Sequence, residues 1–162
     1  MLEMSNLQSV SRTDQIALAP LVEEILTDLT SLAQKNNISL QQDCAELGMV
    51  GSDALIYRLV FNLVENGIKY NRPGGAVRVT LRQERQNAVL RVADTGPGIP
   101  ADCRESIFQP FFRVDKSRSR EYGGAGLGLS LAWEIANLHG GYIWVEKSSE
   151  KGTTIAVELP VQ

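Results

Sequence analysis

The sequence is poor in the residues that mark metal centres, disulfide frameworks and membrane spans. Its 162 residues include two cysteines and one histidine, and aromatic residues make up 6% of the chain. Cys44 and Cys103 lie far apart with no second cysteine near either, so the sequence shows neither a zinc spacing nor a disulfide framework. The apolar run around Pro20 is much shorter than the roughly 20 residues that a membrane helix needs. We therefore expect free thiols and no membrane contact by this chain.

An excess of positive charge, a secretory signal and the commonest catalytic motifs are also absent. Lys and Arg total 16 against 19 Asp and Glu, a net charge of -3, so we expect no nucleic-acid binding. Residues 1–3 do not begin a basic and then apolar leader, which predicts a cytoplasmic location. The phosphate loop G-x-x-x-x-G-K-S/T, a G-x-G-x-x-G turn after a strand, H-E-x-x-H and G-x-S-x-G are all missing. The protein classes that these motifs mark are therefore excluded.

Length and composition predict one domain of mixed helices and strands. With 43% hydrophobic and 22% charged residues, the chain lies near the globular average, and its length suits a single core. Residues 1–12 look like the tail of a longer helix, and we expect residues 13–162 to form the domain. Helices are predicted over 21–35, 53–71 and 127–138, and strands over 38–42, 49–50, 76–83, 88–92, 141–146 and 153–159. This order predicts an α+β fold, with helices on one face of one sheet.

The helix expected over 53–71 carries a polar stripe beside its apolar face. Asn62, Asn66 and Lys69 fall at i, i+4 and i+7, so they share one side of the helix. Asparagine is a weak helix former, so two of them one turn apart cost helix stability without an evident structural benefit. Amide oxygens suit Mg²⁺, which fills its octahedron with water and substrate phosphates, and the lysine would neutralise phosphate charge. A solvated helix face is the alternative.

A glycine-rich turn that begins with a carboxylate follows the strand expected over 88–92. The segment reads Asp94-Thr95-Gly96-Pro97-Gly98-Ile99-Pro100. A carboxylate only accepts hydrogen bonds, so it can recognise the exocyclic amino group of adenine and would repel the O6 atom of guanine. Its two glycines allow a close approach to a flat ring, or a positive φ. An ordinary loop is the alternative.

The region 94–126 is too long for a simple connector, and it ends in a second glycine cluster. Glycines at 123, 124, 126 and 128 run straight into the helix expected over 127–138, which places backbone N–H groups at a helix N-terminus, an arrangement that binds phosphate. Before this cluster come aromatic and then basic residues, which suit either a lid over an anion or a solvated loop: Phe108, Phe111, Phe112, Arg113, Lys116, Arg118 and Arg120.

The only histidine, His139, stands at the end of the helix expected over 127–138, just before Gly140 and Gly141. A cation at a helix C-terminus is stabilised by the helix dipole, and glycine is favoured at the position after a helix. We therefore expect His139 to cap the helix rather than to take part in catalysis.

The order of these motifs resembles that of the catalytic and ATP-binding domain of bacterial two-component sensor histidine kinases, which belong to the GHKL superfamily. Residues 62–70 resemble the N box of that family, 94–100 its G1 box, 108–113 its F box, 124–129 its G2 box, and 152–154 its last and weakest box. Each motif is modest alone, but five of them in sequence make the resemblance specific.

The resemblance implies a Bergerat-type ATP-binding fold, a two-layer α/β sandwich with a mixed sheet of about five strands and about three helices on one face. It implies ATP and Mg²⁺ as ligands, with Asn66 on the metal and Asn62, Lys69 and Arg113 near the phosphates. It places Tyr70, Asp94 and Gly98 at the base, and Thr153 there through water. The other nucleotide-binding positions that it implies are Gly96, Ile99, Phe108, Gly124, Gly126, Leu127 and Gly128. The chain has Gly67 where the family commonly has alanine.

The resemblance also implies partners. These kinases phosphorylate a histidine on a separate dimerisation domain, from which the phosphoryl group passes to the receiver domain of a response regulator. His139 lies in the segment Leu138-His139-Gly140-Gly141, typical of the ATP-binding domain itself, so the acceptor histidine is absent. Residues 2–7 resemble the end of a dimerisation helix. We therefore expect a fragment of a longer sensor that does not phosphorylate itself alone.

Other functions are compatible with the same motifs. ATPases of the superfamily, such as gyrase, mismatch-repair and heat-shock chaperone types, carry a glutamate one turn before the magnesium asparagine as general base. Here that position is Asn62, whose amide cannot take a proton at neutral pH. An anti-sigma-factor serine kinase and a non-catalytic nucleotide sensor are further alternatives. The phenylalanines near the expected lid and the apparent remnant of a dimerisation helix favour the sensor kinase.

Overall fold

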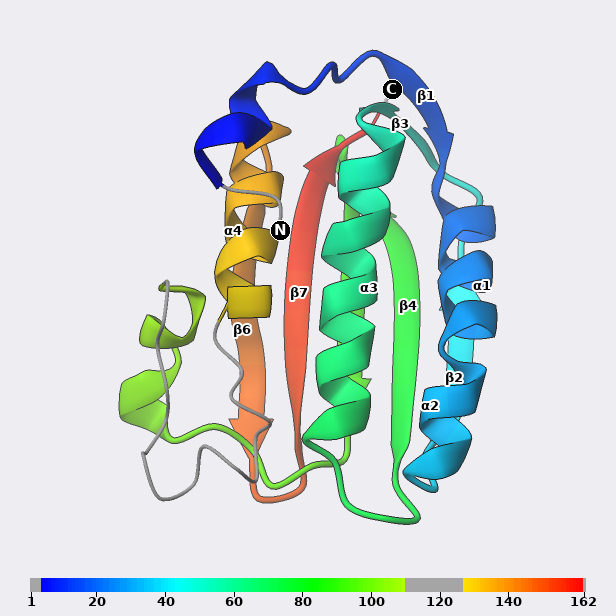
Figure 1. Ribbon diagram of the computed structural model, residues 1–162, viewed down its shortest axis with the longest axis vertical. Coiled ribbons are helices and arrows are strands. Elements are labelled where there is room, and N and C mark those ends of the chain that lie inside the picture. Colours follow the sequence, from blue (N-terminus) through cyan, green and yellow to red (C-terminus); the bar gives the residue numbers. More distant parts are fainter. Residues whose placement is uncertain (1–3, 110–126, 162) are drawn as a thin grey trace.

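Helices and strands are described for residues 4–109 and 127–161 of this computed structural model (Figure 1). The α-helices are α1 (Leu18–Asp28), α2 (Thr30–Lys35), α3 (Asp53–Lys69) and α4 (Leu127–Leu138), and three short 3-10 helices are η1 (Met4–Ser9), η2 (Ala101–Cys103) and η3 (Ser106–Phe108). The strands are β1 (Asp14–Ala17), β2 (Ser39–Cys44), β3 (Gly48–Gly51), β4 (Ala76–Glu84), β5 (Asn87–Asp94), β6 (Tyr142–Ser149) and β7 (Gly152–Pro160).

Five strands form the main sheet in the order β2-β4-β5-β7-β6, and β1 and β3 form a separate antiparallel ribbon. β2 and β4 run parallel and the other neighbours run antiparallel, so the sheet is mixed, as expected. β5 is the central strand, and its last residue, Asp94, pairs with Val77 on β4 and with Thr153 on β7. This register places the start of the glycine-rich turn beside the last motif of the sequence.

The four α-helices lie on one face of the sheet (Figure 1). On β4, Val77, Val79 and Leu81 are buried, whereas the alternating Arg78 and Arg82 are exposed. β4 therefore turns one row of side chains to the helices and the other to water, whereas residues 153–157 of β7 are all buried. The apolar stripe of α3 lies in the resulting core and includes Ile56, Leu59, Val60, Leu63 and Ile68. The two-layer α/β sandwich is confirmed, and the first of the three expected helices is divided into α1 and α2.

α3 begins where the sequence supplies a cap. The hydroxyl of Ser52 accepts the backbone N–H of Leu55 at 3.2 Å, which satisfies one of the free donors of the first turn. Asp53 in the first turn and Lys69 in the last turn both complement the helix dipole. The polar stripe of the sequence therefore lies on one continuous helix, 17 residues long.

The N-terminal part of the chain differs from expectation in two places. The single helix expected over 21–35 is divided at Leu29, which has ψ near 1°, and the hydroxyl of Thr30 bonds the carbonyl of Leu26 at 2.8 Å. Such a bond from a threonine to the previous turn bends a helix. Residues 4–9 form a 3-10 helix that packs against α4, with Leu7 fully buried, rather than an α-helical tail. β1 was not expected.

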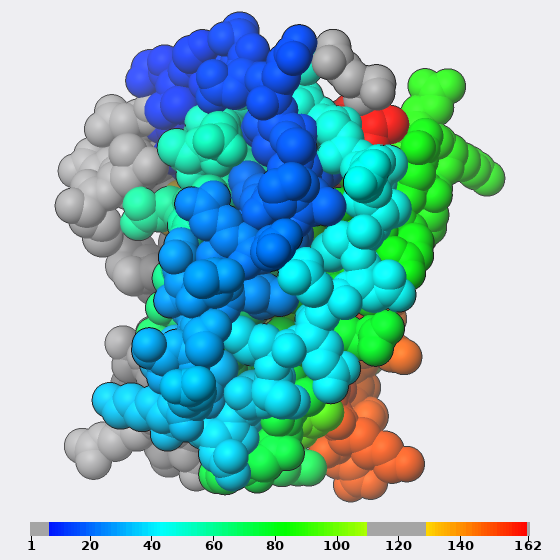
Figure 2. All heavy atoms as spheres, turned by 90° about the vertical axis from the view of Figure 1, so that its right-hand side faces the viewer, coloured from blue at the N-terminus to red at the C-terminus, as the bar shows by residue number. Residues whose placement is uncertain are grey.

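The side of the molecule shown in Figure 2 is formed by α1 and α2, in blue, next to β2 and β3, in cyan. A groove of about 1110 Å³ lies here between the β1–β3 ribbon, the start of α1 and β2. None of the candidate site residues predicted from the sequence lines this groove, so its size does not make it the site. Within the described ranges, no helix is long and apolar enough to cross a membrane.

Candidate functional site

The carboxylate of Asp94, at the end of β5, is fixed by two backbone donors. Its Oδ1 atom accepts the N–H of Gly96 at 2.9 Å and the N–H of Thr153 at 3.2 Å. Both bonds go to the same oxygen, which leaves Oδ2 as the atom available to a ligand. Burial raises the pKa of Asp94 above its ordinary value of 3.8, although the two backbone bonds act in the opposite direction. The site therefore presents a held and partly desolvated hydrogen-bond acceptor.

Two glycines let the chain pass close to this carboxylate. Gly98 has φ +87°, and a Cβ atom there would overlap the carbonyl oxygen of Ser149. Gly152 has φ +146°, and a Cβ atom there would overlap the carbonyl oxygen of Asp94 itself. Only glycine combines these backbone angles with this spacing. The glycine-rich turn and the β6–β7 turn are thus packed backbone to backbone.

Ser148 joins the two turns, and the sequence did not reveal it. Its hydroxyl accepts the N–H of Ile99 at 2.8 Å and lies 2.7 Å from the hydroxyl of Thr153. Its carbonyl accepts a bond from Arg104 Nη2 at 2.7 Å, while Arg104 Nε is buried without a partner in the described part of the chain. A serine in a strand carries no motif, so only the folded structure shows that it lies against Ile99.

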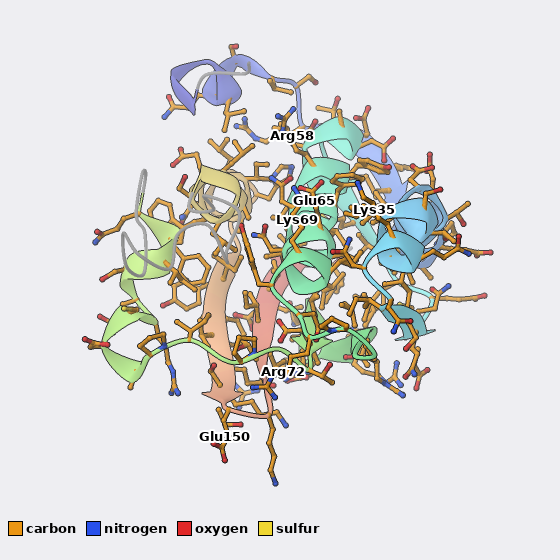
Figure 3. All side chains as sticks on the ribbon, turned by 60° about the horizontal axis from the view of Figure 1, so that its bottom comes forward. Lys35, Arg58, Glu65, Lys69, Arg72 and Glu150 are labelled. Carbon is orange, nitrogen blue, oxygen red and sulfur yellow. The ribbon has the colours of Figure 1, made fainter. Side chains whose placement is uncertain are left out.

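A second network connects the end of α3 to the same region. Thr95 donates its hydroxyl proton to Asn71 Oδ1 at 2.9 Å and accepts the N–H of Ala76 at 3.0 Å. Asn71 in turn donates to the carbonyl of Ala76 at 3.0 Å. Arg72, labelled in Figure 3 with Glu150, donates to the carbonyl of Glu150 at 2.9 Å. Tyr70 also lies here, because a Cβ atom at Gly96 would overlap its carbonyl oxygen.

Of the polar stripe of α3, Lys69 is exposed, whereas Asn62 and Asn66 are half-buried. Figure 3 shows Arg58, Glu65 and Lys69 along one side of α3. Lys69 Nζ lies 3.7 Å from Glu65 Oε1, an exposed i,i+4 pair of the kind that contributes only about 0.3–0.5 kcal/mol. A lysine held this weakly can turn to a ligand anion. Gly67 lies close to Asp94, because a Cβ atom built on Gly67 would be 3.7 Å from Asp94 Cβ. The structure therefore brings the polar stripe and the Asp94 turn to the same end of α3.

Asn66 is the residue of this stripe whose surroundings fit a metal ligand. Its Nδ2 atom is buried and has no hydrogen-bond partner among residues 4–109 and 127–161. The two ends of an amide are assigned from hydrogen bonds, so an unpaired buried end is equally an oxygen position with free lone pairs. In these ranges no cluster of three His, Cys, Asp or Glu residues could hold a metal. The donor set fits a hard cation that takes one amide oxygen and completes its shell with phosphate and water.

Several residues from the sequence interpretation are placed elsewhere or fall outside the described residues. Phe108 is 9% exposed and belongs to the core together with Leu129 of α4. α4 begins at Leu127, as expected, so Gly128 lies in its first turn. Arg113, Gly124 and Gly126 lie outside the described residues, as do the rest of the expected lid and its glycine cluster: Phe111, Phe112, Lys116, Arg118, Arg120 and Gly123.

His139 has the structural role that was expected, but it is not a cation. Its Nδ1–H donates to the carbonyl of Ile135 at 2.8 Å, and its Nε2 accepts the backbone N–H of Ser52 at 3.0 Å. Burial lowers the pKa of His139 below 6.5, and the charge of Arg12 acts in the same direction. The expectation of a charged histidine at the helix end was wrong, because the ring accepts one bond and so must be neutral. It joins the end of α4 to the cap of α3.

Comparisons with known proteins agree with this fold. Residues 51–162 match the family described as histidine kinase-, DNA gyrase B-, and HSP90-like ATPase. Sensor histidine kinase RppB of Synechocystis sp. is 40% identical over 89% of this chain and 32% of that protein. Adaptive-response sensory kinase SasA of Crocosphaera subtropica is 34% identical over 96% of this chain and 41% of that protein. The chain thus spans well under half of these curated relatives.

Solved structures show the same architecture. The mycobacterial sensor histidine kinase MprB superposes with a TM-score of 0.80 at 27% identity, covering 93% of this chain and 98% of the other. The catalytic domain of histidine kinase ThkA superposes with a TM-score of 0.80 at 28% identity, covering 91% of this chain and 95% of the other.

Proposed function

The chain belongs to the histidine kinase-, DNA gyrase B- and HSP90-like ATPases, as a catalytic ATP-binding domain of the histidine kinase type, and we propose that it transfers the γ-phosphoryl group of ATP to a histidine on a separate dimerisation domain. The observation that carries the proposal is the fixed carboxylate of Asp94 at the same end of α3 as the amides of the polar stripe. One part would bind the base and the other the phosphates. Residues 1–12 would connect to the dimerisation domain.

Adenine would be recognised by Asp94. Its Oδ1 atom is occupied by two backbone donors, so Oδ2 would accept the exocyclic amino group of the base. Guanine would present an acceptor oxygen to the same carboxylate and would be excluded. Gly96, Gly98 and Ile99 would lie along the ring, with Tyr70 beside them. Thr153 would hold a water at the base, because its hydroxyl already meets that of Ser148.

The phosphates would lie along α3. Asn66 would give its amide oxygen to Mg²⁺, and Asn62 and Lys69 would contact phosphate oxygens. When bound, the metal supplies positive charge that neutralises the triphosphate. The positions outside the described residues, Arg113, Gly124 and Gly126, would complete the phosphate site together with Leu127 and Gly128 at the start of α4. Lys69 would exchange its weak pairing with Glu65 for a phosphate.

The transfer itself needs an acceptor nitrogen in line with the γ-phosphorus. The nitrogen–phosphorus bond would form as the bond to the β,γ-bridging oxygen breaks, and ADP would leave with that electron pair. The imidazole proton would pass to a base brought by the acceptor domain, since neither Asn62 nor Asn66 can take a proton at neutral pH. The domain would contribute binding and orientation.

Hydrolysis of ATP in place of transfer is disfavoured by the same residues. Asn62 stands where the ATPases of the superfamily have a general base, and Glu65, the carboxylate nearest to it on α3, pairs with Lys69. Water would therefore not be activated. ThkA has also been solved in complex with the response regulator protein TrrA, at 27% identity to this chain, which supports a response regulator as the final phosphoryl acceptor.

The experiment has two parts. Calorimetric titration should show binding of ATP that requires Mg²⁺, and weak binding of GTP. Labelled ATP should then leave the chain itself unlabelled and label the dimerisation domain of the parent kinase when that domain is added. Strong labelling of the chain alone, or no labelling of the added domain, would sink the proposal.

A further inference from the structure

A hollow of about 300 Å³ lies on the outer face of the first half of α3. It is lined by Ala54, Tyr57, Arg58, Phe61 and Asn62. Ala54, Tyr57, Arg58 and Phe61 take no part in the proposed nucleotide site. Asn62 is the residue expected at the phosphates. The hollow therefore begins where the proposed phosphate site ends.

One wall of the hollow is a stacked aromatic pair. The rings of Tyr57 and Phe61 stack at a centroid distance of 5.8 Å and an angle of 24°. The hydroxyl of Tyr57 donates to the carboxylate of Asp28 on α1, and this bond raises the pKa of Tyr57 to about 12, so the ring stays neutral at physiological pH. Fixed, half-buried aromatic rings of this kind serve as anchors in protein interfaces.

The rim of the hollow carries a cation without a counterion. Arg58 is exposed, and within residues 4–109 and 127–161 no ion pair to its guanidinium is recorded. Glu65 and Lys69, further along the same side of α3, are paired with each other (Figure 3). The Arg58 end of the hollow thus carries an unpaired positive charge, whereas the Tyr57 side borders the carboxylate of Asp28. The Arg58 end is therefore the part that is complementary to a carboxylate next to an apolar side chain.

The position of the hollow identifies its occupant, given the proposed function. An acceptor imidazole must reach the γ-phosphate next to Asn62, and Arg58 lies four residues before Asn62, about 6 Å along the helix axis. A helix with its side chains is about 10–12 Å across, so a helix that delivers a side chain to Asn62 also covers this part of α3. We propose that Ala54, Tyr57, Arg58 and Phe61 form the docking surface for the helix that carries the acceptor histidine, with a carboxylate of that helix at Arg58.

The test measures the rate of phosphoryl transfer against the concentration of the parent kinase's dimerisation domain, together with ATP affinity. Arg58→Glu should raise the KM for the dimerisation domain about tenfold, because it opposes two like charges. Ala54→Trp, which fills the hollow from an exposed position, should raise it similarly. Both variants should bind ATP as the parent does. Lys35→Glu makes the same charge change on α2, on the side shown in Figure 2, and should alter neither quantity.

The outcomes separate this inference from the function on which it rests. If the unaltered chain transfers no phosphoryl group to the dimerisation domain, the proposed function fails. If the unaltered chain transfers but either Arg58→Glu or Ala54→Trp keeps the parental KM, the docking surface is overturned. A fall in ATP affinity in these variants would also overturn it, since the hollow would then belong to the nucleotide site.

Discussion

The two oxygens of Asp94 serve different purposes. Oδ1 receives the N–H groups of Gly96 and Thr153, and thereby fixes the turn, while Oδ2 is left for a base. In an asparagine at this position, only the amide oxygen could accept the two backbone N–H groups, because its amino group is itself a donor. Its amino group would then face the ligand. The backbone thus prevents the amide from turning to restore the contact.

Asp94→Asn should therefore lower the affinity for ATP about tenfold or more, since a buried group left without its partner costs roughly 1–3 kcal/mol. Calorimetric titration measures this, with the exposed Asp102→Asn as the matched control. Equal affinity in the parent and in Asp94→Asn would show that adenine is placed wrongly.

The same substitution should not lower the melting temperature without nucleotide. The pKa of Asp94 is raised above 3.8 in the folded chain, so the free energy of unfolding decreases as pH rises from 3.8 to the folded pKa. At neutral pH the charge of Asp94 therefore lowers the stability of the fold. Asparagine removes the charge and keeps the backbone bonds. Thermal unfolding at pH 7 checks this, and a clear drop in melting temperature would contradict it.

Gly98 and Gly74 form a natural pair for testing the glycine-rich turn. Both have nearly the same φ, +87° and +86°, but a Cβ atom at Gly74 meets nothing within 4 Å, whereas one at Gly98 overlaps Ser149. Gly74→Ala should thus lower the free energy of unfolding only by the strain of an alanine in the left-handed conformation, about 1–2 kcal/mol, and should leave ATP affinity unchanged. Gly98→Ala should in addition displace the turn and lower ATP affinity by about tenfold or more. Similar affinities of the two variants would mean that the close packing of the turn is unimportant for the nucleotide.

Local patterns were sufficient to predict Asp94, Gly98 and Asn66 as candidates, because each stands in a short segment whose residue types suggest a chemistry. They were not sufficient for Ser148, whose partner Ile99 is 49 residues away, or for Arg104, which donates to Ser148. Contacts of this kind depend on the registers of β6 with β7 and of β7 with β5, which the residue types alone do not indicate.

At the scale of elements, α3 and α4 are joined end to end by His139. Its ring accepts the N–H of Ser52 at the cap of α3 and donates to Ile135 in α4. α3 carries the polar stripe, and α4 begins at the glycine cluster expected at the phosphates. The contact therefore fixes the relative position of the two helices between which the nucleotide is proposed to lie.

His139 should make the stability of the domain depend on pH. The pKa of His139 is lowered in the folded chain, so the unfolded chain binds a proton first as pH falls below about 6.5. The free energy of unfolding therefore decreases as pH falls from about 6.5 to the folded pKa. Denaturant unfolding at pH 7.5 and 5.5 measures this. Because it is the only histidine of the chain, His139→Ala should remove that pH dependence, and an unchanged dependence would refute the assignment.

The sequence predicted long elements better than short ones. α4 was placed with the correct bounds, and the β4–β5 hairpin within two residues at each end, because their patterns extend over many residues. β1 was missed because it has only four residues and pairs with β3, which lies far along the chain. The bend at Leu29 depends on the hydroxyl of Thr30 reaching Leu26, which apolar periodicity does not record.

At the scale of the whole molecule, the proposed base site and the proposed docking surface both involve α3. The proposed base site lies where β5 and β7 meet the end of α3, and the proposed docking surface lies on the first half of the same helix. A single helix would thus connect the nucleotide to the partner. The fold class followed from the order of the elements, whereas our proposal of transfer rather than hydrolysis depends on one side chain, Asn62.

The fate of the γ-phosphoryl group tests this distinction most directly. Labelled ATP is incubated with the chain and the parent kinase's dimerisation domain, and the label is divided between that domain and free phosphate in one reaction. Asn62 cannot act as a base, and general acid–base catalysis typically contributes about 10²- to 10⁴-fold to a reaction rate. Label should therefore enter the dimerisation domain far faster than phosphate is released. Omitting the dimerisation domain should leave ATP nearly intact. Phosphate released as fast without the dimerisation domain as with it, and no label on that domain, would contradict the account and identify the chain as an ATPase.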